Sequence, residues 1–124
     1  MNSSNNPDDS AAIAHKRYDE FVASVKGGSP IFYLIKDSRF GCCIYEGETE
    51  PVVLFWSDSA STEQCRDERF DDYEIGECSA TDFVAKVLPY LDEKGGWVGA
   101  NYDKSATGIS VRPRALITEI SGEH

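Results

Sequence analysis

Two short apolar runs constrain the fold of this chain more than any other feature. Residues 31–35 read IFYLI and residues 52–56 read VVLFW, and neither run contains a charged side chain. Short apolar runs that are rich in β-branched and aromatic residues are typical of strands buried on both faces. The sequence therefore predicts a sheet with helices packed on it.

Turn and hairpin patterns place the remaining strands. The segment SRFGCCIYEGE follows a short turn near Asp37–Ser38 and is predicted to pair with the first run as a hairpin. The segment DDYEIGEC is predicted to be a short strand, and WVGANY and TGISVR form a second hairpin around the loop DKSA. Because hairpins dominate, the predicted fold class is α+β, with a mainly antiparallel sheet of about five to six strands.

Apolar residues at helical spacing predict the helices that pack on this sheet. The stripe of the first helix, which Ser10 can cap, is Ala14, Tyr18, Phe21, Val22 and Val25. The stripe of the clearest helix, which Ser79 caps and Pro89 kinks or divides, is Phe83, Val84, Val87, Leu88 and Leu91. Residues 59–70 form a weaker helix with Ser57 or Asp58 as its cap, and Pro113 opens a last short helix.

Length and composition indicate one domain. The chain has 124 residues, which suits a single core. Residues 1–10 are polar and without periodicity, so we expect a disordered tail there and a single α+β domain over 11–124. No apolar run is long enough to span a membrane, and the N-terminus lacks the pattern of a secretion signal. We expect a cytoplasmic protein without membrane contact.

The charge balance limits the class of partner. Twelve basic and 22 acidic residues give a formal net charge of −10. Such a surface repels phosphate backbones, which argues against nucleic acid, and it speeds the encounter with a basic protein. The simpler interpretation is that the acidic residues keep the protein soluble.

The common catalytic and metal-binding motifs are missing from the sequence. The four cysteines lie at 42, 43, 65 and 78 without C-x-x-C spacing, which indicates small buried side chains in a reducing compartment. His15 and His124 are the two histidines, and both are interpreted as surface residues. Phosphate-binding glycine loops and the G-x-S-x-G motif are absent. The sequence predicts no catalytic residue, no metal site and no cofactor.

Polar residues follow two strand ends and form the candidate site. Ser57 and Asp58 come directly after Trp56 at the end of the second apolar run. The other predicted strand end carries Asn101, Tyr102 and Asp103. These residues can line a small amphipathic pocket or a protein hot spot if the two ends are neighbours. The alternative, which we favour, is a core Trp, a helix cap and a turn.

Several segments together resemble a known family. They are FWSD at the end of a strand, Ala60 and Cys65 in the next helix, Tyr73–Glu74, DFVAKVLPYL, VGANYD, and Gly108 with VRPRAL. In order and spacing they resemble the bacterial family called domain of unknown function 2750, from about residue 15 to residue 120. The resemblance implies a small bacterial cytoplasmic protein with a single domain, and it implies no activity.

Two functions are compatible with these features, besides a purely structural fold with an ordinary acidic surface. The first is a non-enzymatic interaction or accessory protein, for example of the immunity type, that binds a basic partner. The second is a small-molecule or metal-binding protein, or an enzyme, with a site near Trp56 and Tyr102. We favour the first, because the catalytic constellations are missing. The oligomeric state and the strand order do not follow from the sequence.

Overall fold

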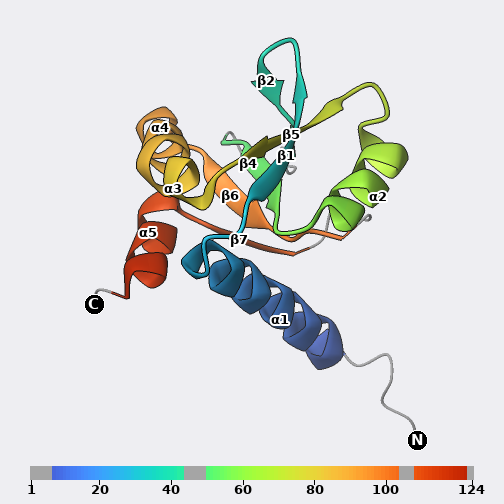
Figure 1. Cartoon of the computed structure of the whole chain (residues 1–124). Coiled ribbons are helices and arrows are strands. Elements are labelled where there is room, and N and C mark those ends of the chain that lie inside the picture. The colour runs from blue at the N-terminus through green and yellow to red at the C-terminus, as the bar shows by residue number, and fades with distance from the viewer. Residues whose placement is uncertain (1–6, 44–49, 104–107, 123–124) are drawn as a thin grey trace, which may run out of the picture.

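The computed structural model describes residues 7–43, 50–103 and 108–122. Of the tail predicted over 1–10, residues 1–6 lie outside the described residues, and residues 7–10 are helical, which corrects the prediction. Figure 1 shows the helices and strands along the chain. The elements in chain order are α1 (Pro7–Lys26), β1 (Ile31–Lys36), β2 (Arg39–Phe40), β3 (Cys42–Cys43), β4 (Val52–Trp56), α2 (Ser59–Arg69), β5 (Glu74–Cys78), α3 (Ala80–Asp82), the π-helical turn η1 (Phe83–Val87), α4 (Leu88–Lys94), β6 (Trp97–Ala100), β7 (Ile109–Val111) and α5 (Pro113–Ser121).

The described strands form one sheet in which most pairs are antiparallel. Its main path runs β2-β1-β4-β6-β7, while β3 pairs with β4 and β5 pairs with β1. The predicted α+β class and the mainly antiparallel sheet are confirmed. The exception is the pair of β4 and β6, which is parallel, with Val52 opposite Trp97 and Phe55 opposite Ala100. This parallel pair brings the ends of two distant segments to the same edge of the sheet.

Gly41 interrupts the hairpin partner of β1. The turn before it has positive φ at both Asp37 (51°) and Ser38 (65°), the geometry of a two-residue hairpin turn. The Gly41 N–H donates to the Leu34 carbonyl (2.8 Å), and its carbonyl accepts from the Leu54 N–H (3.1 Å). The predicted single strand is thus two short pieces, because Gly41 joins β1 to β4 between them. A Cβ at this position would lie 3.1 Å from the Leu34 Cβ, so a larger residue does not fit without a shift.

Alternate residues of the central strands face two different cores. Ile31, Val53 and Phe55 face a cluster that contains the helices α1, α3, α4 and α5. Leu34, Leu54 and Trp56 face a second cluster with α2 and Tyr102. Figure 1 shows α2 on one side of the sheet and the α3–α4 region on the other. Successive side chains of a strand point to opposite faces, so covering both faces explains why these strands are apolar throughout.

The helices largely follow the predicted stripes. Tyr18, Phe21, Val22 and Val25 of α1 are buried, although the helix begins at Pro7 and not after Ser10. Proline suits the first turn of a helix because its fixed φ is helical and it has no N–H to leave unpaired. The helix that Ser79 caps runs without a gap through α3, η1 and α4, so Pro89 follows a π-helical turn and does not divide the helix. There the Leu88 N–H reaches the Phe83 carbonyl five residues back, a π turn that precedes the proline.

None of the helices in the described ranges combines the length and the apolar character needed to cross a membrane.

Candidate functional site

The carboxyl ends of the parallel strands β4 and β6 lie side by side. The Asn101 N–H donates to the Phe55 carbonyl (2.9 Å) and extends the pairing by one residue beyond β6. Crevices at the carboxyl ends of parallel strands are common ligand-binding places in α/β sheets. We call this region, with Trp56, Ser57, Asp58, Asn101, Tyr102 and Asp103, the strand-end joint. All the residues predicted for a site are therefore brought together here.

Two aromatic residues form the buried part of the strand-end joint. Trp56 is fully buried, and its indole N–H donates to the backbone carbonyl of Tyr102 (2.8 Å). Tyr102 is 2% exposed, and its ring packs against Gly99 and Gly108 so closely that a Cβ at Gly99 would lie 2.9 Å from it. Real Cβ contacts are almost never this short, so both glycines are needed for the ring to fit. These two aromatic side chains therefore have a packing role.

Asn101 connects three segments of the chain. Its side-chain Oδ1 accepts from the backbone N–H of Ser57 (2.9 Å). Its Nδ2 donates to Ser57 Oγ (3.0 Å) and to the Arg17 carbonyl on α1 (3.0 Å). Its φ is 52°, in the left-handed region where asparagine is one of the few tolerated side chains. One amide side chain therefore links β4, β6 and α1.

Asp58 caps the helix that follows β4. Its Oδ1 accepts from the Ser61 N–H (2.8 Å) and its Oδ2 from Ser61 Oγ (3.0 Å). The Thr62 hydroxyl donates to the Asp58 carbonyl (2.7 Å). Of the two predicted caps, Asp58 is the one used, and a cap of this kind stabilises a helix by about 1 kcal/mol.

A small polar cleft of about 210 Å³ opens over the strand-end joint. Its charged lining residues are Arg17, Glu20, Asp58 and Asp103. Arg17 and Asp103 form an ion pair across the cleft at 3.4 Å. The remaining carboxylates make the lining acidic, and Gln64 of α2 adds an amide. The cleft is smaller than the pockets of about 300–1,000 Å³ that hold most organic ligands.

The hydrogen bonds of the strand-end joint restrict the chemistry available there. The polar side-chain atoms of Ser57, Asp58 and Asn101 already bond to one another, to the backbone or to the Ser61 hydroxyl. In the described part of the chain, no group of three or more His, Cys, Asp or Glu side chains is placed to hold a metal ion. The described histidine, His15, is exposed on α1 and does not line the cleft. The strand-end joint thus connects β4, β6, α1 and α2. The side chains of the cleft that are left to bind a ligand are chiefly Glu20 and Gln64.

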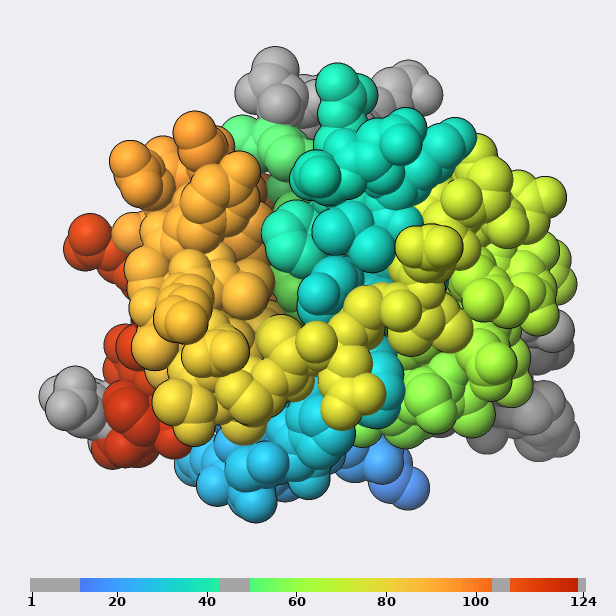
Figure 2. Space-filling view, turned by 45° about the horizontal axis from the view of Figure 1, so that its top comes forward, coloured from blue at the N-terminus to red at the C-terminus, as the bar shows by residue number. Residues whose placement is uncertain are grey.

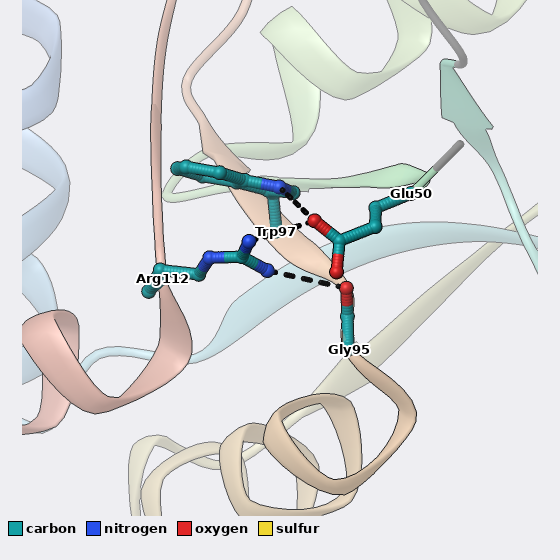
Figure 3. Close-up of polar contacts among 4 residues, drawn as sticks. All are labelled: Glu50, Gly95, Trp97 and Arg112. Atoms are coloured by element: carbon teal, nitrogen blue, oxygen red, sulfur yellow. Dashed lines mark hydrogen bonds and ion pairs between the residues drawn. The ribbon is translucent and has the colours of Figure 1, made fainter. Parts of the chain in front are cut away.

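A second polar cluster, at the opposite ends of the same strands, was missed by the sequence analysis. Figure 3 shows the Arg112 guanidinium against the Trp97 ring, 4.0 Å from its centroid. Arg112 also donates to the Gly95 carbonyl (3.2 Å) and to Glu50 (2.7 Å). Trp97 donates to the same Glu50 oxygen (3.2 Å). The hydrogen bond from Arg112 has the larger effect and the one from Trp97 the smaller, and both hold the pKa of Glu50 below its ordinary value.

Three segments that are distant in sequence meet in this second cluster. Glu50 precedes β4, Trp97 opens β6, and Arg112 lies between β7 and α5. In the sequence, a Trp follows two glycines and an Arg precedes Pro113. Neither pattern indicates which residues these side chains contact. The cluster is partly exposed, with 44% of the Arg112 side chain accessible. It holds the amino ends of the strands as the joint holds their carboxyl ends.

The strongest charge concentration lies on α2 and β5. Residues 58–77 contain eight acidic and two basic residues, so their net charge is −6. The whole chain has a net charge of −10. All eight acidic residues are exposed. We call them the acidic α2–β5 surface: Asp58, Glu63, Asp67, Glu68, Asp71, Asp72, Glu74 and Glu77. Two are paired, Asp72 with Lys36 and Asp67 with Arg66, and the Lys36 contact lowers the pKa of Asp72.

The fold and its two strand-end clusters define a small α+β protein built on a mixed, mainly antiparallel sheet. A family model described as "Protein of unknown function (DUF2750)" matches residues 18–120. The match covers most of the 124 residues, so the chain belongs to this family, as the resemblance predicted. No curated protein and no solved structure matches the chain significantly.

Proposed function

We propose that this chain is a non-enzymatic interaction module that binds a basic protein through the acidic α2–β5 surface. The observation that carries the proposal is the uneven charge: 20 consecutive residues hold a net charge of −6, with every carboxylate exposed. A field of one sign on one side of a molecule steers an oppositely charged partner into contact. We place the protein in the bacterial cytoplasm, as an accessory or immunity-type protein that contacts neither nucleic acid nor membrane.

The competing explanation is that the charge serves solubility alone. Solubility depends on the total charge, whereas a docking surface depends on where the charge lies. Two variants with equal total charge separate these explanations. The first carries Glu63→Gln, Glu68→Gln and Asp71→Asn on the acidic α2–β5 surface. The matched control carries Asp19→Asn, Asp82→Asn and Glu93→Gln, which are exposed residues outside this surface and outside the cleft.

The experiment compares the proteins that each immobilised variant retains from a native bacterial lysate. At low salt, the wild type and the control should retain the same basic protein, and the surface variant should lose it. Retention should also disappear at about 1 M salt, where the Debye length falls to about 3 Å. Equal retention by both variants, or no salt-sensitive protein in any sample, would contradict the proposal.

The cleft over the strand-end joint supports a second candidate, the binding of a small cationic ligand. The supporting observation is that two distant strand ends meet around one acidic cleft. Small amines can be titrated into the labelled protein while amide chemical shifts are followed. Glu20→Gln should weaken such binding, and Asp19→Asn, on the same helix outside the cleft, should not. If neither variant differs from the wild type, the cleft is not a binding site.

A further inference from the structure

Strand β5 lies at an edge of the sheet. It pairs with β1 through five residues, from Ile31 opposite Cys78 to Ile35 opposite Glu74. No described strand pairs with its other side. In Figure 2, β5 belongs to the yellow band at the front of the molecule, between α2 and α3. An edge strand presents unpaired backbone groups, which makes it a template for an additional strand.

The pairing of β1 determines which β5 groups point outward. The Leu34 carbonyl accepts from Gly41, so the backbone polar groups of Leu34 face away from β5. Successive residues of a strand direct their backbone N–H and C=O groups to opposite sides. In an antiparallel pair, two opposed residues direct these groups either toward each other or both away from the pair. Ile75, opposite Leu34, and Glu77, opposite Phe32, therefore direct their N–H and C=O groups outward. In the described loops and caps, no backbone hydrogen bond involves either residue.

The charges beside this edge select the strand that can pair with it. Glu74 and Glu77 of β5 are exposed, and Glu68 and Asp71 precede them. A second copy paired through β5 would bring these carboxylates together, and like charges across strands are destabilising. A basic segment would meet opposite charges instead. The edge is thereby protected from self-pairing and remains open to a basic strand.

Shallow, open hollows border the two ends of the β1–β5 pair. A hollow of about 480 Å³ lies at one end, lined by Ile35, Lys36, Asp72 and Glu74 among others. A second hollow of about 570 Å³ lies at the other end, lined by Gly28, Pro30, Glu77, Cys78 and Ser79. The other edge of the sheet, β7, has three residues and leads directly into α5, so it offers a shorter template.

We propose that β5 binds an extended basic segment of a partner protein as an additional strand. The outward groups of Ile75 and Glu77 supply the backbone hydrogen bonds, and the surrounding carboxylates select lysine and arginine side chains. This inference rests on the proposed function and deepens it, because it names the partner's conformation and the strand that receives it.

The first test uses two synthetic peptides of identical charge. One is a capped seven-residue peptide of alternating lysine and valine. The other is the same peptide with N-methyl groups on alternate residues, on the edge that would pair, which removes backbone donors and keeps the charge. Binding is measured at low salt by fluorescence anisotropy. Methylation should weaken binding by about tenfold or more, the effect of losing one or two net hydrogen bonds.

The second test changes the protein at one position. Glu77→Pro removes an outward N–H without breaking the ladder to β1, since proline is tolerated where the N–H faces away from the sheet. Glu77→Gln removes the same charge and keeps the N–H. The proline variant should bind the unmethylated peptide about tenfold more weakly than the glutamine variant. If Glu77→Pro does not fold, as judged by circular dichroism, the peptide pair decides alone.

The outcomes separate this inference from the proposed function. Equal binding of both peptides, with loss of binding in the Glu63, Glu68 and Asp71 variant, would overturn strand addition and retain an acidic docking surface. No binding of either peptide would also overturn strand addition, whatever the lysate experiment gives. Loss of affinity on methylation, together with slowed hydrogen exchange at the Ile75 and Glu77 amides, would support it.

Discussion

The strand-end joint and the β5 edge differ in whether their polar groups have partners. At the joint, the Asn101 amide and the Asp58 carboxylate bond within the molecule, and buried side-chain polar atoms without a partner are absent among the described residues. At the edge, Ile75 and Glu77 direct backbone groups to solvent beside exposed carboxylates. Both regions are polar, but the side chains left for a ligand at the joint are chiefly Glu20 and Gln64, whereas the edge leaves backbone groups for another strand.

Whether polar groups have internal partners separates structural from binding residues in a small domain. A satisfied polar network stabilises the fold, so removing it should cost stability. A polar surface without internal partners contributes little to folding, so removing it should affect binding. Substitutions at the joint should therefore lower the free energy of unfolding, and substitutions at the edge should lower the affinity for a partner.

The largest loss is expected when the joint loses its aromatic anchor. Trp56→Ala removes a fully buried side chain and its bond to Tyr102, and should cost about 3–5 kcal/mol. Trp97→Ala is the matched control, because Trp97 also donates its indole N–H but is only partly buried. Urea unfolding followed by far-UV circular dichroism measures both. Equal losses would mean that burial at the joint does not dominate.

Asn101→Ala should cost about 3 kcal/mol, less than the loss of Trp56. It leaves the Ser57 N–H and the Arg17 carbonyl without their side-chain partner, and it places alanine at positive φ. Asn101→Gly also loses the hydrogen bonds but tolerates the backbone angle, so it should recover about 1 kcal/mol. The same urea experiment applies. If alanine and glycine are equally stable, the backbone angle carries no strain.

Lowering the pH should change the stabilising contribution of Glu50, at the amino ends of β4 and β6, and not that of Asn101, at their carboxyl ends. The pKa of Glu50 is lowered by Arg112 and Trp97, so its stabilising contribution is present above the ordinary Glu value of about 4.3 and is lost as pH falls through the lower folded value. Glu50→Gln should therefore flatten the decline in stability at acidic pH. The cost of Asn101→Ala should be the same at neutral and acidic pH, because that amide does not titrate. Thermal unfolding across pH checks both statements.

The smallest effect on stability is expected at the acidic α2–β5 surface. The variant with Glu63→Gln, Glu68→Gln and Asp71→Asn should unfold within about 0.5 kcal/mol of the wild type, because these exposed side chains bury nothing. Relief of repulsion among like charges favours a slight gain. A loss comparable to that of Asn101→Ala would show that these carboxylates belong to the folded structure, and it would remove the contrast between the two regions.

Local sequence signals were sufficient for most elements and insufficient for their junctions. The runs 31–35 and 52–56, the Asp58 cap and the cap at Ser79 follow from side-chain type and spacing, which act over a few residues. The parallel pairing of β4 with β6 joins residues about 45 positions apart, and no local pattern encodes it. Gly41 was included in one strand because its role depends on Leu34 and Leu54 together.

The candidate site shows the same limit. The polar residues after Trp56 and after Ala100 were identified, but the bonds from Asn101 to Ser57 and Arg17 needed three segments in place. Glu50, Trp97 and Arg112 were missed because each is unremarkable in its own segment and the stacking exists only in the fold. The outward groups of β5 could not be assigned before the register with β1 was known.

Amide chemical-shift mapping of the labelled protein with the unmethylated lysine–valine peptide tests the central contrast most directly. The largest changes should fall on Glu74–Cys78 and the neighbouring acidic residues of α2, while the amides of Ser57, Asn101 and Asp103 stay in place. Changes concentrated at Ser57, Asn101 and Asp103, with β5 unaffected, would contradict it and make the strand-end joint the binding site.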